Sequence, residues 1–182
     1  MPSVTTQPPL PEPLRQARRL IREIPNFPKQ GVLFRDITPL LQDPAALALV
    51  MERLETPWQG SVELVAGIES RGFIFGALLA QRLGAGFVPI RKPGKLPFKT
   101  ESVSYGLEYG TDTLEIHIDS CRDRRVLLCD DLLATGGTAS AAATLVERVG
   151  GKVAGYCFAI ELLELRGRAR LHGARVESLF TF

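Results

Sequence analysis

An acidic pair followed by a glycine-rich turn is the part of the sequence best suited to chemistry. Asp130 and Asp131 come directly after the apolar run at residues 126–129, and the turn Ala-Thr-Gly-Gly-Thr at residues 134–138 follows them. Glycines let a backbone wrap closely around an anion, and threonine hydroxyls can donate hydrogen bonds to it. In open α/β sheets, ligands bind beyond the carboxyl ends of strands, where helix N-termini expose free N–H groups. The pattern therefore predicts a phosphate-binding turn.

The two aspartates suggest a sugar beside that phosphate. Carboxylates accept paired hydrogen bonds from vicinal hydroxyls, so an acidic pair ahead of a phosphate turn suits a ribose 5-phosphate. An aspartate pair alone would more often be a solvated acidic turn before a helix, but the buried strand and the glycine-rich turn favour the sugar. The turn lacks the lysine of a triphosphate-binding loop and the Gly-x-Gly-x-x-Gly spacing of a dinucleotide-binding loop.

Two further segments could bind an anion. Residues 67–73 follow an apolar run and place Arg71 in a tight Ser-Arg-Gly turn at the expected start of a helix. Residues 91–97 concentrate three cations beside two prolines and a glycine. Taken alone, an arginine after a strand is usually a surface charge, and a basic loop is often only solvated.

Alternating strands and helices are predicted to position these segments. Continuous apolar runs at residues 62–68, 87–90, 126–129 and 153–160 alternate with helical patterns at residues 72–83 and 137–149. Strands without a polar face are typical of a parallel sheet covered on both faces. Between the two halves, in–out alternation over residues 113–118 predicts a hairpin.

The N-terminal part is predicted to be a tail and a small helical segment. Residues 1–13 contain five prolines and are expected to be extended. Apolar spacing predicts a helix over residues 14–24 that Pro25 ends. Residues 32–34 are either a strand or an ordered loop, and Asp43-Pro44 predicts the start of a helix over residues 45–54. We expect a single domain over residues 14–182.

Composition excludes several classes of protein. The chain of 182 residues is 45% hydrophobic and 23% charged, as globular domains are, and its net charge of +2 comes from interleaved acidic and basic residues. We therefore expect no nucleic-acid partner, and no apolar stretch approaches the roughly 20 residues of a membrane span. Three cysteines without CxxC spacing predict reduced structural thiols and a cytoplasmic protein. His117 and His172 are expected to be structural.

Residues 126–138 resemble the signature with which type I phosphoribosyltransferases bind phosphoribosyl pyrophosphate (PRPP). Their sequence is similar to the form of this signature in the adenine-specific branch. The likeness extends from about Leu20 to about Leu165. It implies an α/β fold with an open, mostly parallel sheet flanked by helices, a small N-terminal hood at about residues 14–40 and a flexible catalytic loop hairpin at about residues 92–112. The implied reaction joins adenine to PRPP and gives AMP and pyrophosphate. The implied cofactor is Mg²⁺ held mainly by PRPP and water, with no dedicated protein ligands.

The resemblance also implies roles for particular residues. Asp130 and Asp131 would hold the ribose hydroxyls, and the 5-phosphate would be bound by Ala134, Thr135, Gly136, Gly137 and Thr138. Pyrophosphate would be bound by Glu69, Ser70, Arg71, Arg91, Lys92 and Lys95, with Arg71 acting on the leaving group. In this family the Glu69–Ser70 peptide is often cis. Many relatives have aspartate in place of Glu69, which is a mild departure.

The base would be recognised by the hood. A backbone N–H and C=O pair at Leu33 would bind adenine, Phe34 and Arg35 would wall the pocket, and Leu162 would cover the opposite ring face. Leu33 and Leu162 could instead be core residues. Glu108, in the returning arm of the loop, would assist proton removal from the base or only help the loop to close. The resemblance further implies a homodimer with residues around the second βα unit at its interface.

Two other functions remain to be weighed. A phosphoribosyltransferase for a 6-oxopurine would commonly carry a lysine near residues 153–160, where this chain has only Lys152. A regulator that senses PRPP would commonly append a DNA-binding domain, for which we expect no room. Both alternatives are less consistent with the intact loop motifs.

Overall fold

The computed structural model describes residues 10–106 and 110–182. They form two compact units, the first ending at Glu52 and the second comprising Arg53–Phe182. The hood predicted at about residues 14–40 lies within the first unit. No helix in the described part of the chain is long and apolar enough to cross a lipid bilayer.

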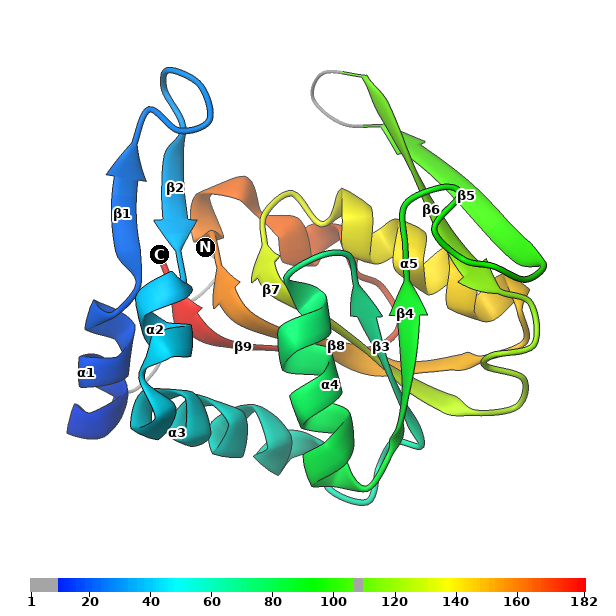
Figure 1. Ribbon diagram of the computed structural model, residues 1–182, viewed down its shortest axis with the longest axis horizontal. Coiled ribbons are helices and arrows are strands. Elements are labelled where there is room, and N and C mark those ends of the chain that lie inside the picture. The colour runs from blue at the N-terminus through cyan, green and yellow to red at the C-terminus, as the bar shows by residue number, and fades with distance from the viewer. Residues whose placement is uncertain (1–9, 107–109) are drawn as a thin grey trace, which may run out of the picture. The chain divides into compact units, whose positions relative to one another are not determined.

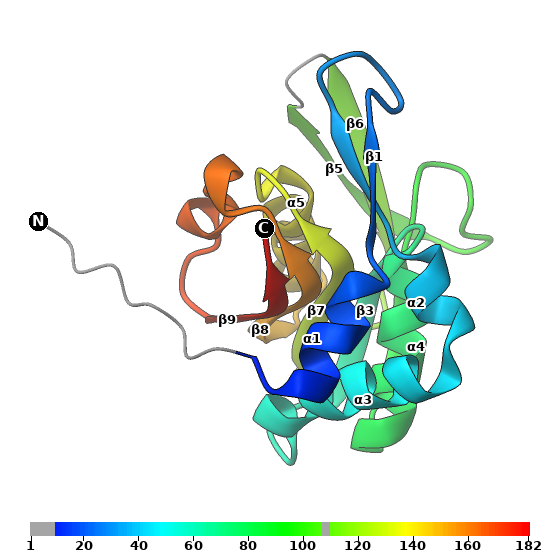
Figure 2. The same ribbon diagram turned by 90° about the vertical axis from the view of Figure 1, so that its left-hand side faces the viewer.

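The first unit combines short helices with a two-stranded antiparallel sheet. Its elements are α1 (Glu12–Arg19), β1 (Arg22–Pro25), β2 (Leu33–Asp36), α2 (Thr38–Gln42) and α3 (Pro44–Glu55), the last of which runs on into the second unit. β1 follows α1 and pairs with β2 (Figure 2). The Oδ1 atom of Asp43 accepts hydrogen bonds from the N–H groups of Ala45 and Ala46, as predicted for the start of α3.

The helix predicted over residues 14–24 is wrong at both ends. It begins at Glu12, inside the expected tail, and ends at Arg19. Leu14, Ala17 and Ile21 are buried as the apolar spacing requires, but Ile24 is 36% exposed and lies in β1. Pairing with β2 supplies the backbone hydrogen bonds of this segment, so tertiary contacts override the helical spacing. The segment at residues 32–34, left open by the sequence, enters β2.

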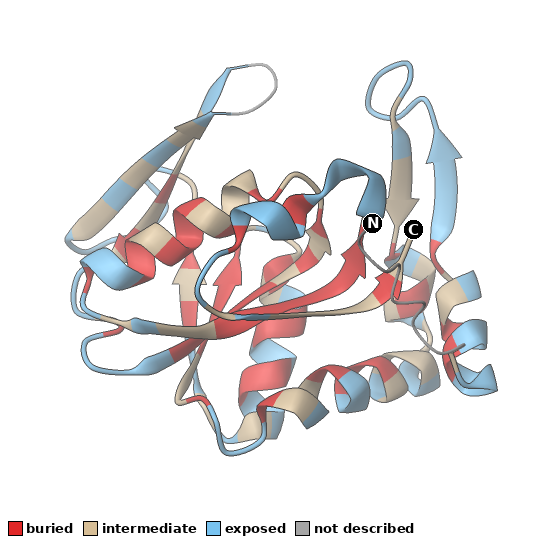
Figure 3. Ribbon diagram, turned by 180° about the vertical axis from the view of Figure 1, so that it is seen from behind, coloured by how far each residue is buried: buried red, intermediate tan, exposed pale blue. Residues whose placement is uncertain are grey.

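A five-stranded parallel sheet forms the centre of the second unit. Its strand order is β4-β3-β7-β8-β9, and every neighbouring pair is parallel. The strands and the two connecting helices are β3 (Leu64–Ile68), α4 (Gly72–Leu83), β4 (Gly86–Ile90), β7 (Arg125–Leu133), α5 (Gly137–Arg148), β8 (Lys152–Glu161) and β9 (Arg175–Thr181). α4 lies on one face of the sheet and α5 on the other (Figures 1 and 3). This arrangement confirms the predicted open α/β fold.

The remaining elements of the second unit are a hairpin and three short 3₁₀ helices: β5 (Thr100–Gly106), β6 (Thr111–His117), η1 (Thr56–Trp58), η2 (Leu163–Leu165) and η3 (Gly167–Arg170). The hairpin confirms the predicted alternation, because Leu114 and Ile116 of β6 are fully buried and join the core that α5 forms with the sheet. All three cysteines are buried thiols without a disulfide. The central strands and the helix sides that face them make up the buried interior in Figure 3.

Gly155 of β8 lies directly against the indole ring of Trp58. A Cβ atom at this position would lie 2.1 Å from the ring and 2.8 Å from the carbonyl oxygen of Arg175. We expect Gly155→Ala to lower the free energy of unfolding by about 1–3 kcal/mol, because neither the ring nor the neighbouring strand can move away cheaply. Urea denaturation measures this loss. Gly106→Ala is the control, since a Cβ there meets nothing within 4 Å; equal stability of all three proteins would contradict the packing argument.

Candidate active site

The glycine-rich turn between β7 and α5 forms a small pocket. The pocket has a volume of about 70 Å³ and is lined by Asp130, Phe158 and residues 132–139, which include every residue predicted to bind the 5-phosphate. Gly136 precedes α5 with a φ of 80°, a conformation that favours glycine. Within the described residues no side chain caps this end of α5. Its first N–H groups can therefore bind an anion.

A larger pocket adjoins the turn and unites the residues predicted for ribose with those predicted for pyrophosphate. It has a volume of about 290 Å³. Its lining contains seven residues predicted from the sequence: Glu69, Ser70, Arg71, Lys92, Asp130, Asp131 and Thr138. Three further residues, Tyr105, Asp112 and Leu132, complete the lining. The loop after β3, the loop after β4 and the end of β7 thus meet at one place, as expected for the carboxyl ends of parallel strands.

The two carboxylates are held in a poorly solvated position at the end of β7. Asp131 is only 5% exposed, and the Nε atom of Arg71 lies 2.9 Å from its Oδ2 atom. Burial raises the pKa of Asp130 well above its ordinary value, and the neighbouring Asp131 carboxylate raises it further. Burial also raises the pKa of Asp131, although the Arg71 guanidinium opposes this shift. Two poorly solvated carboxylates at one place can accept hydrogen bonds from the hydroxyl groups of a ligand.

The loop between β3 and α4 contains the cis peptide bond predicted at Glu69–Ser70. The Oε2 atom of Glu69 accepts hydrogen bonds from the Lys92 N–H at 2.9 Å and from Arg91 Nε at 3.2 Å. These bonds hold the pKa of Glu69 below its ordinary value, the Lys92 N–H making the largest contribution. Glu69 therefore fastens this loop to the segment that follows β4.

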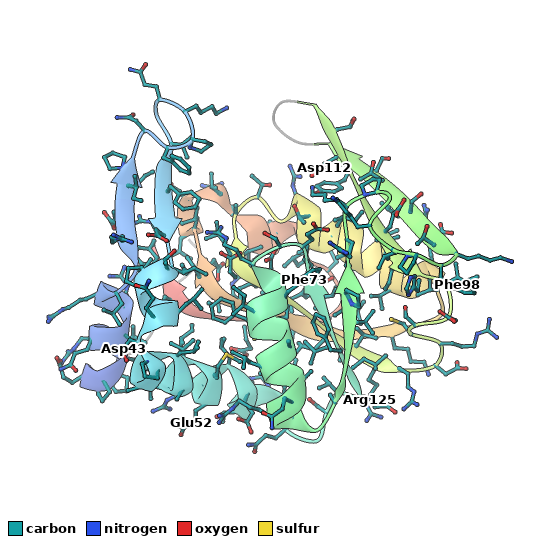
Figure 4. The ribbon with its side chains drawn as sticks, in the orientation of Figure 1. Asp43, Glu52, Phe73, Phe98, Asp112 and Arg125 are labelled. Carbon is teal, nitrogen blue, oxygen red and sulfur yellow. The ribbon has the colours of Figure 1, made fainter. Side chains whose placement is uncertain are left out.

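Arg91 and Lys95 are not among the residues that line the larger pocket. The guanidinium of Arg91 lies 5.9 Å from the ring centre of Phe73, which Figure 4 labels, and donates to the Lys95 carbonyl oxygen at 3.1 Å. In this arrangement Arg91 supports the loop that carries Lys92. A direct role of Arg91 and Lys95 toward pyrophosphate stays a prediction.

Tyr105 and Asp112 were missed by the sequence analysis. They are register partners in the hairpin, and the Asp112 carboxylate forms an ion pair with Lys92 Nζ (Figure 4 labels Asp112). The Tyr105 hydroxyl donates to Asp112 Oδ2 at 3.1 Å and accepts from the Thr138 hydroxyl at 3.2 Å. Burial alone would raise the pKa of Asp112, but Lys92, the Thr113 N–H and the Tyr105 hydroxyl together outweigh it and lower the pKa. Strand alternation could indicate that Tyr105 is partly buried, but no local pattern pairs Lys92 with Asp112.

The remaining predicted residues lie elsewhere. Glu108 is outside the described residues. Leu33, Phe34 and Arg35 belong to β2 of the first unit, where Phe34 packs edge-to-face on Phe27 and Arg35 forms an ion pair with Glu23. Leu162 follows β8 in the second unit, and its N–H donates to the Leu133 carbonyl oxygen at 2.9 Å. Their predicted common role as a base pocket stays a prediction.

Comparison with known proteins identifies the family of the chain. Residues 40–176 match the family model of the phosphoribosyl transferase domain, so the fold and site define a phosphoribosyltransferase. An adenine phosphoribosyltransferase of Methylococcus capsulatus is 58% identical over 167 residues, which cover 91% of this chain and 98% of the relative. The chain belongs to the adenine phosphoribosyltransferase family.

Solved structures of relatives have the same fold. The adenine phosphoribosyltransferase of Thermoanaerobacter pseudethanolicus is 53% identical and superimposes with a TM-score of 0.90, covering 93% of this chain and 99% of that one. The enzyme of Saccharomyces cerevisiae, in a complex with adenine and an imino-altritol bisphosphate, is 38% identical with a TM-score of 0.86, covering 92% of this chain and 98% of that one. The predicted fold class is therefore confirmed by relatives as well as by topology.

The raised pKa of Asp130 predicts that this residue lowers stability. Its folded pKa lies above that of the unfolded chain, so the cost to folding begins above about pH 4 and is complete only above the folded pKa. We therefore expect Asp130→Asn to raise the melting temperature at neutral pH, with about 2–4 °C for each 1 kcal/mol recovered.

Calorimetry between pH 4 and pH 8 measures the effect, and the gain should vanish toward pH 4. The control is Asp119→Asn, which removes an exposed charge and should leave the profile unchanged. A lower melting temperature for Asp130→Asn at neutral pH would contradict the assignment of Asp130 as a destabilising, half-buried acid.

Proposed function

We propose a division of labour among the residues of this site for the transfer that the family performs. The chain transfers the 5-phosphoribosyl group of PRPP to adenine and releases AMP and pyrophosphate, a step of purine salvage. One observation carries the proposed roles: the larger pocket places Arg71 and Lys92, the two aspartates and Thr138 of the glycine-rich turn around one space. These groups suit the pyrophosphate, the ribose hydroxyls and the 5-phosphate of one ligand.

The ribose and its phosphate bind at the end of β7 and the start of α5. Asp130 and Asp131 accept hydrogen bonds from the two ribose hydroxyls, which replace the water that burial has removed. The 5-phosphate occupies the turn at residues 134–138, where main-chain N–H groups at the start of α5 and threonine hydroxyls point to its oxygens. This arrangement explains why the phosphate turn needs no lysine.

The pyrophosphate binds on the opposite side of the pocket. Arg71 and Lys92 carry the positive charges there, while Ser70 lies in the adjoining loop and Glu69 fastens that loop to Lys92. Arg91 and Lys95 contribute from the segment after β4. Arg71 stabilises the leaving group as charge moves onto it, which is the interaction that grows stronger in the transition state.

Displacement at the anomeric carbon proceeds with inversion, and positive charge develops on the ribose. Adenine N9 attacks and loses a proton. Glu108 is proposed either to accept this proton or to help close the loop. Closure of the hairpin loop over the ligand excludes water and limits hydrolysis of PRPP.

Magnesium fits the oxygen-rich side of the pocket but not a dedicated protein cage. No three His, Cys, Asp or Glu residues gather into a metal site within residues 10–106 and 110–182. The Asp130 and Asp131 carboxylates line the same pocket as the proposed pyrophosphate residues and add negative charge beside an ion whose ligands would come mainly from PRPP and water. Mg²⁺ bound together with PRPP would neutralise charge on the departing pyrophosphate.

Adenine is recognised mainly by backbone groups of the hood. The N–H and C=O of Leu33 pair with the base, and Phe34 and Arg35 flank it. Relatives support a purine in this role, since the yeast enzyme was solved with adenine and that of Giardia lamblia, 36% identical, with 9-deazaadenine.

The enzyme acts in the cytoplasm as a homodimer, and its interface is proposed at α4 and β4 instead of at the second βα unit that the resemblance implied. Three large apolar side chains of these elements remain exposed in the single chain: Ile74 by 39%, Leu78 by 37% and Phe87 by 37%. Burial of such a patch against a second copy removes apolar area from water. Sedimentation equilibrium tests this, and a monomer at every concentration would contradict it.

An assay of base specificity tests the activity directly. Purified protein with PRPP and Mg²⁺ is expected to form AMP from adenine and to leave hypoxanthine, guanine and orotate unconverted. Product formation is followed by chromatography of the nucleotide. Turnover of another base at a comparable kcat/KM would contradict the proposed recognition by Leu33.

Arg71→Ala separates the pyrophosphate role from the base role. We expect the KM for PRPP and the Kd for pyrophosphate to rise about tenfold to a hundredfold, because a charged hydrogen bond to the leaving group is lost. The Kd for adenine should stay unchanged. Arg82→Ala, at the other end of α4 and paired with Glu55, is the control and should alter neither constant. An equal loss of adenine binding in Arg71→Ala would refute this division.

A further inference from the structure

The 3₁₀ helix η3 lies in backbone contact with the phosphate turn. A Cβ atom on Gly136 would come within 2.4 Å of the Gly167 carbonyl oxygen, and one on Gly167 within 2.3 Å of the Ala134 carbonyl oxygen. Neither position leaves room for a methyl group. The shape of the turn at residues 134–136 therefore depends on where Gly167, the first residue of η3, is held.

A buried carboxylate holds this helix in place. Glu161, the last residue of β8, is only 3% exposed. Arg168 Nε lies 2.7 Å from its Oε1 atom and 2.9 Å from its Oε2 atom, and the Ser178 hydroxyl also donates to Oε2. A buried carboxylate is costly unless it is paired and hydrogen-bonded. Glu161 is fully engaged, so its partner Arg168 has little freedom to move.

Arg168 also fastens η3 to the edge strand. Its Nη1 atom donates to the Val176 carbonyl oxygen at 2.7 Å, and its Nη2 atom donates to the Ser178 hydroxyl at 2.8 Å. One guanidinium thus joins β8, η3 and β9. A planar group with several fixed donors suits this task, because its hydrogen bonds set direction as well as distance.

The proposed reaction uses neither Glu161 nor Arg168, and neither residue lines the two pockets of the site. Their neighbours nevertheless touch the site. Gly167 precedes Arg168 and contacts the phosphate turn, and Leu162 follows Glu161 and donates to the carbonyl oxygen of Leu133, just before that turn. The ion pair is thus one residue away from both contacts.

We propose that Arg168, anchored by Glu161, is a positioning residue for the 5-phosphate of the substrate. It holds Gly167 against residues 134–136 and so fixes the N–H groups that bind the phosphate. The inference rests on the proposed function of this turn. The pyrophosphate residues Arg71 and Lys92 follow β3 and β4 and have no described contact with η3, so we expect Arg168 to act mainly on the phosphate side.

The test compares two ligands on one variant. In Arg168→Met, isothermal titration calorimetry with ribose 5-phosphate and with pyrophosphate, both with Mg²⁺ and well below the melting temperature, measures the two sides separately. The Kd for ribose 5-phosphate is expected to rise about tenfold to a hundredfold, since small displacements of binding groups have effects of this size. The Kd for pyrophosphate should change by less than about twofold.

Arg175→Met is the matched control. Arg175 belongs to β9 and, like Arg168, forms an ion pair with a glutamate, Glu177, but it lies on Trp58 and has no contact with η3 among its described interactions. Both Kd values should match those of the unaltered chain. Hydrogen exchange of the peptide covering residues 134–138 should be faster in Arg168→Met and unchanged in Arg175→Met.

Gly167→Ala and Arg168→Lys provide independent tests if Arg168→Met does not fold. Gly167→Ala keeps the ion pair but places a methyl group against Ala134. Arg168→Lys keeps the charge but loses the planar guanidinium with its several N–H donors. Both variants should weaken the binding of ribose 5-phosphate more than the binding of pyrophosphate. Unchanged or equally weakened binding of the two ligands in the folded variants would overturn the inference. Failure of the unaltered chain to bind ribose 5-phosphate would instead overturn the proposed function of the turn.

Discussion

The site depends on two carboxylates held at the end of one buried strand. β7 carries Asp130 and Asp131 to the point where α4 begins, and a Cβ atom on Gly72, the first residue of α4, would lie 2.9 Å from Asp130 Oδ1 and 2.8 Å from the Cys129 carbonyl oxygen. The first turn of α4 and the end of β7 are therefore in contact. Because Arg71 immediately precedes that helix and pairs with Asp131, the positions of the cation and the acids are set together.

The central architecture could be predicted from the sequence because strong local patterns encode its strands and helices. β3, β4, β7 and β8 are apolar runs, and α4 was predicted with the observed ends. β9 was missed, since its residues are mostly half-buried and include the polar side chains of Arg175, Glu177 and Ser178. Such an edge strand gains its stability from pairing with β8, which the local sequence pattern of residues 175–181 does not show. The helix predicted over residues 14–24 was too long at its C-terminal end for the same reason, because β1 forms by pairing with β2.

Residues that act through their own segment could also be predicted. The acidic pair, the glycine-rich turn and Arg71 each belong to a short motif, and the structure brings them to one pocket. Asp112 and Tyr105 belong to no short motif. Their place in the pocket follows only from the pairing of β5 with β6 and from their contacts with Lys92 and Thr138. Glu161 and Arg168 are seven residues apart in a polar stretch, and the sequence does not show that the first of them is buried.

The pairing of Lys92 with Asp112 has a consequence for how an anion enters. The ammonium already has an internal counter-ion, so in the proposed pyrophosphate role of Lys92 an arriving diphosphate would exchange one negative partner for another and would not meet a bare cation. Displacing Asp112 offsets part of the electrostatic attraction between Lys92 and the ligand. A multiply charged ligand keeps more of this attraction than a single inorganic phosphate ion does. In that role the ion pair would favour a diphosphate over small single anions before any sugar or base is recognised.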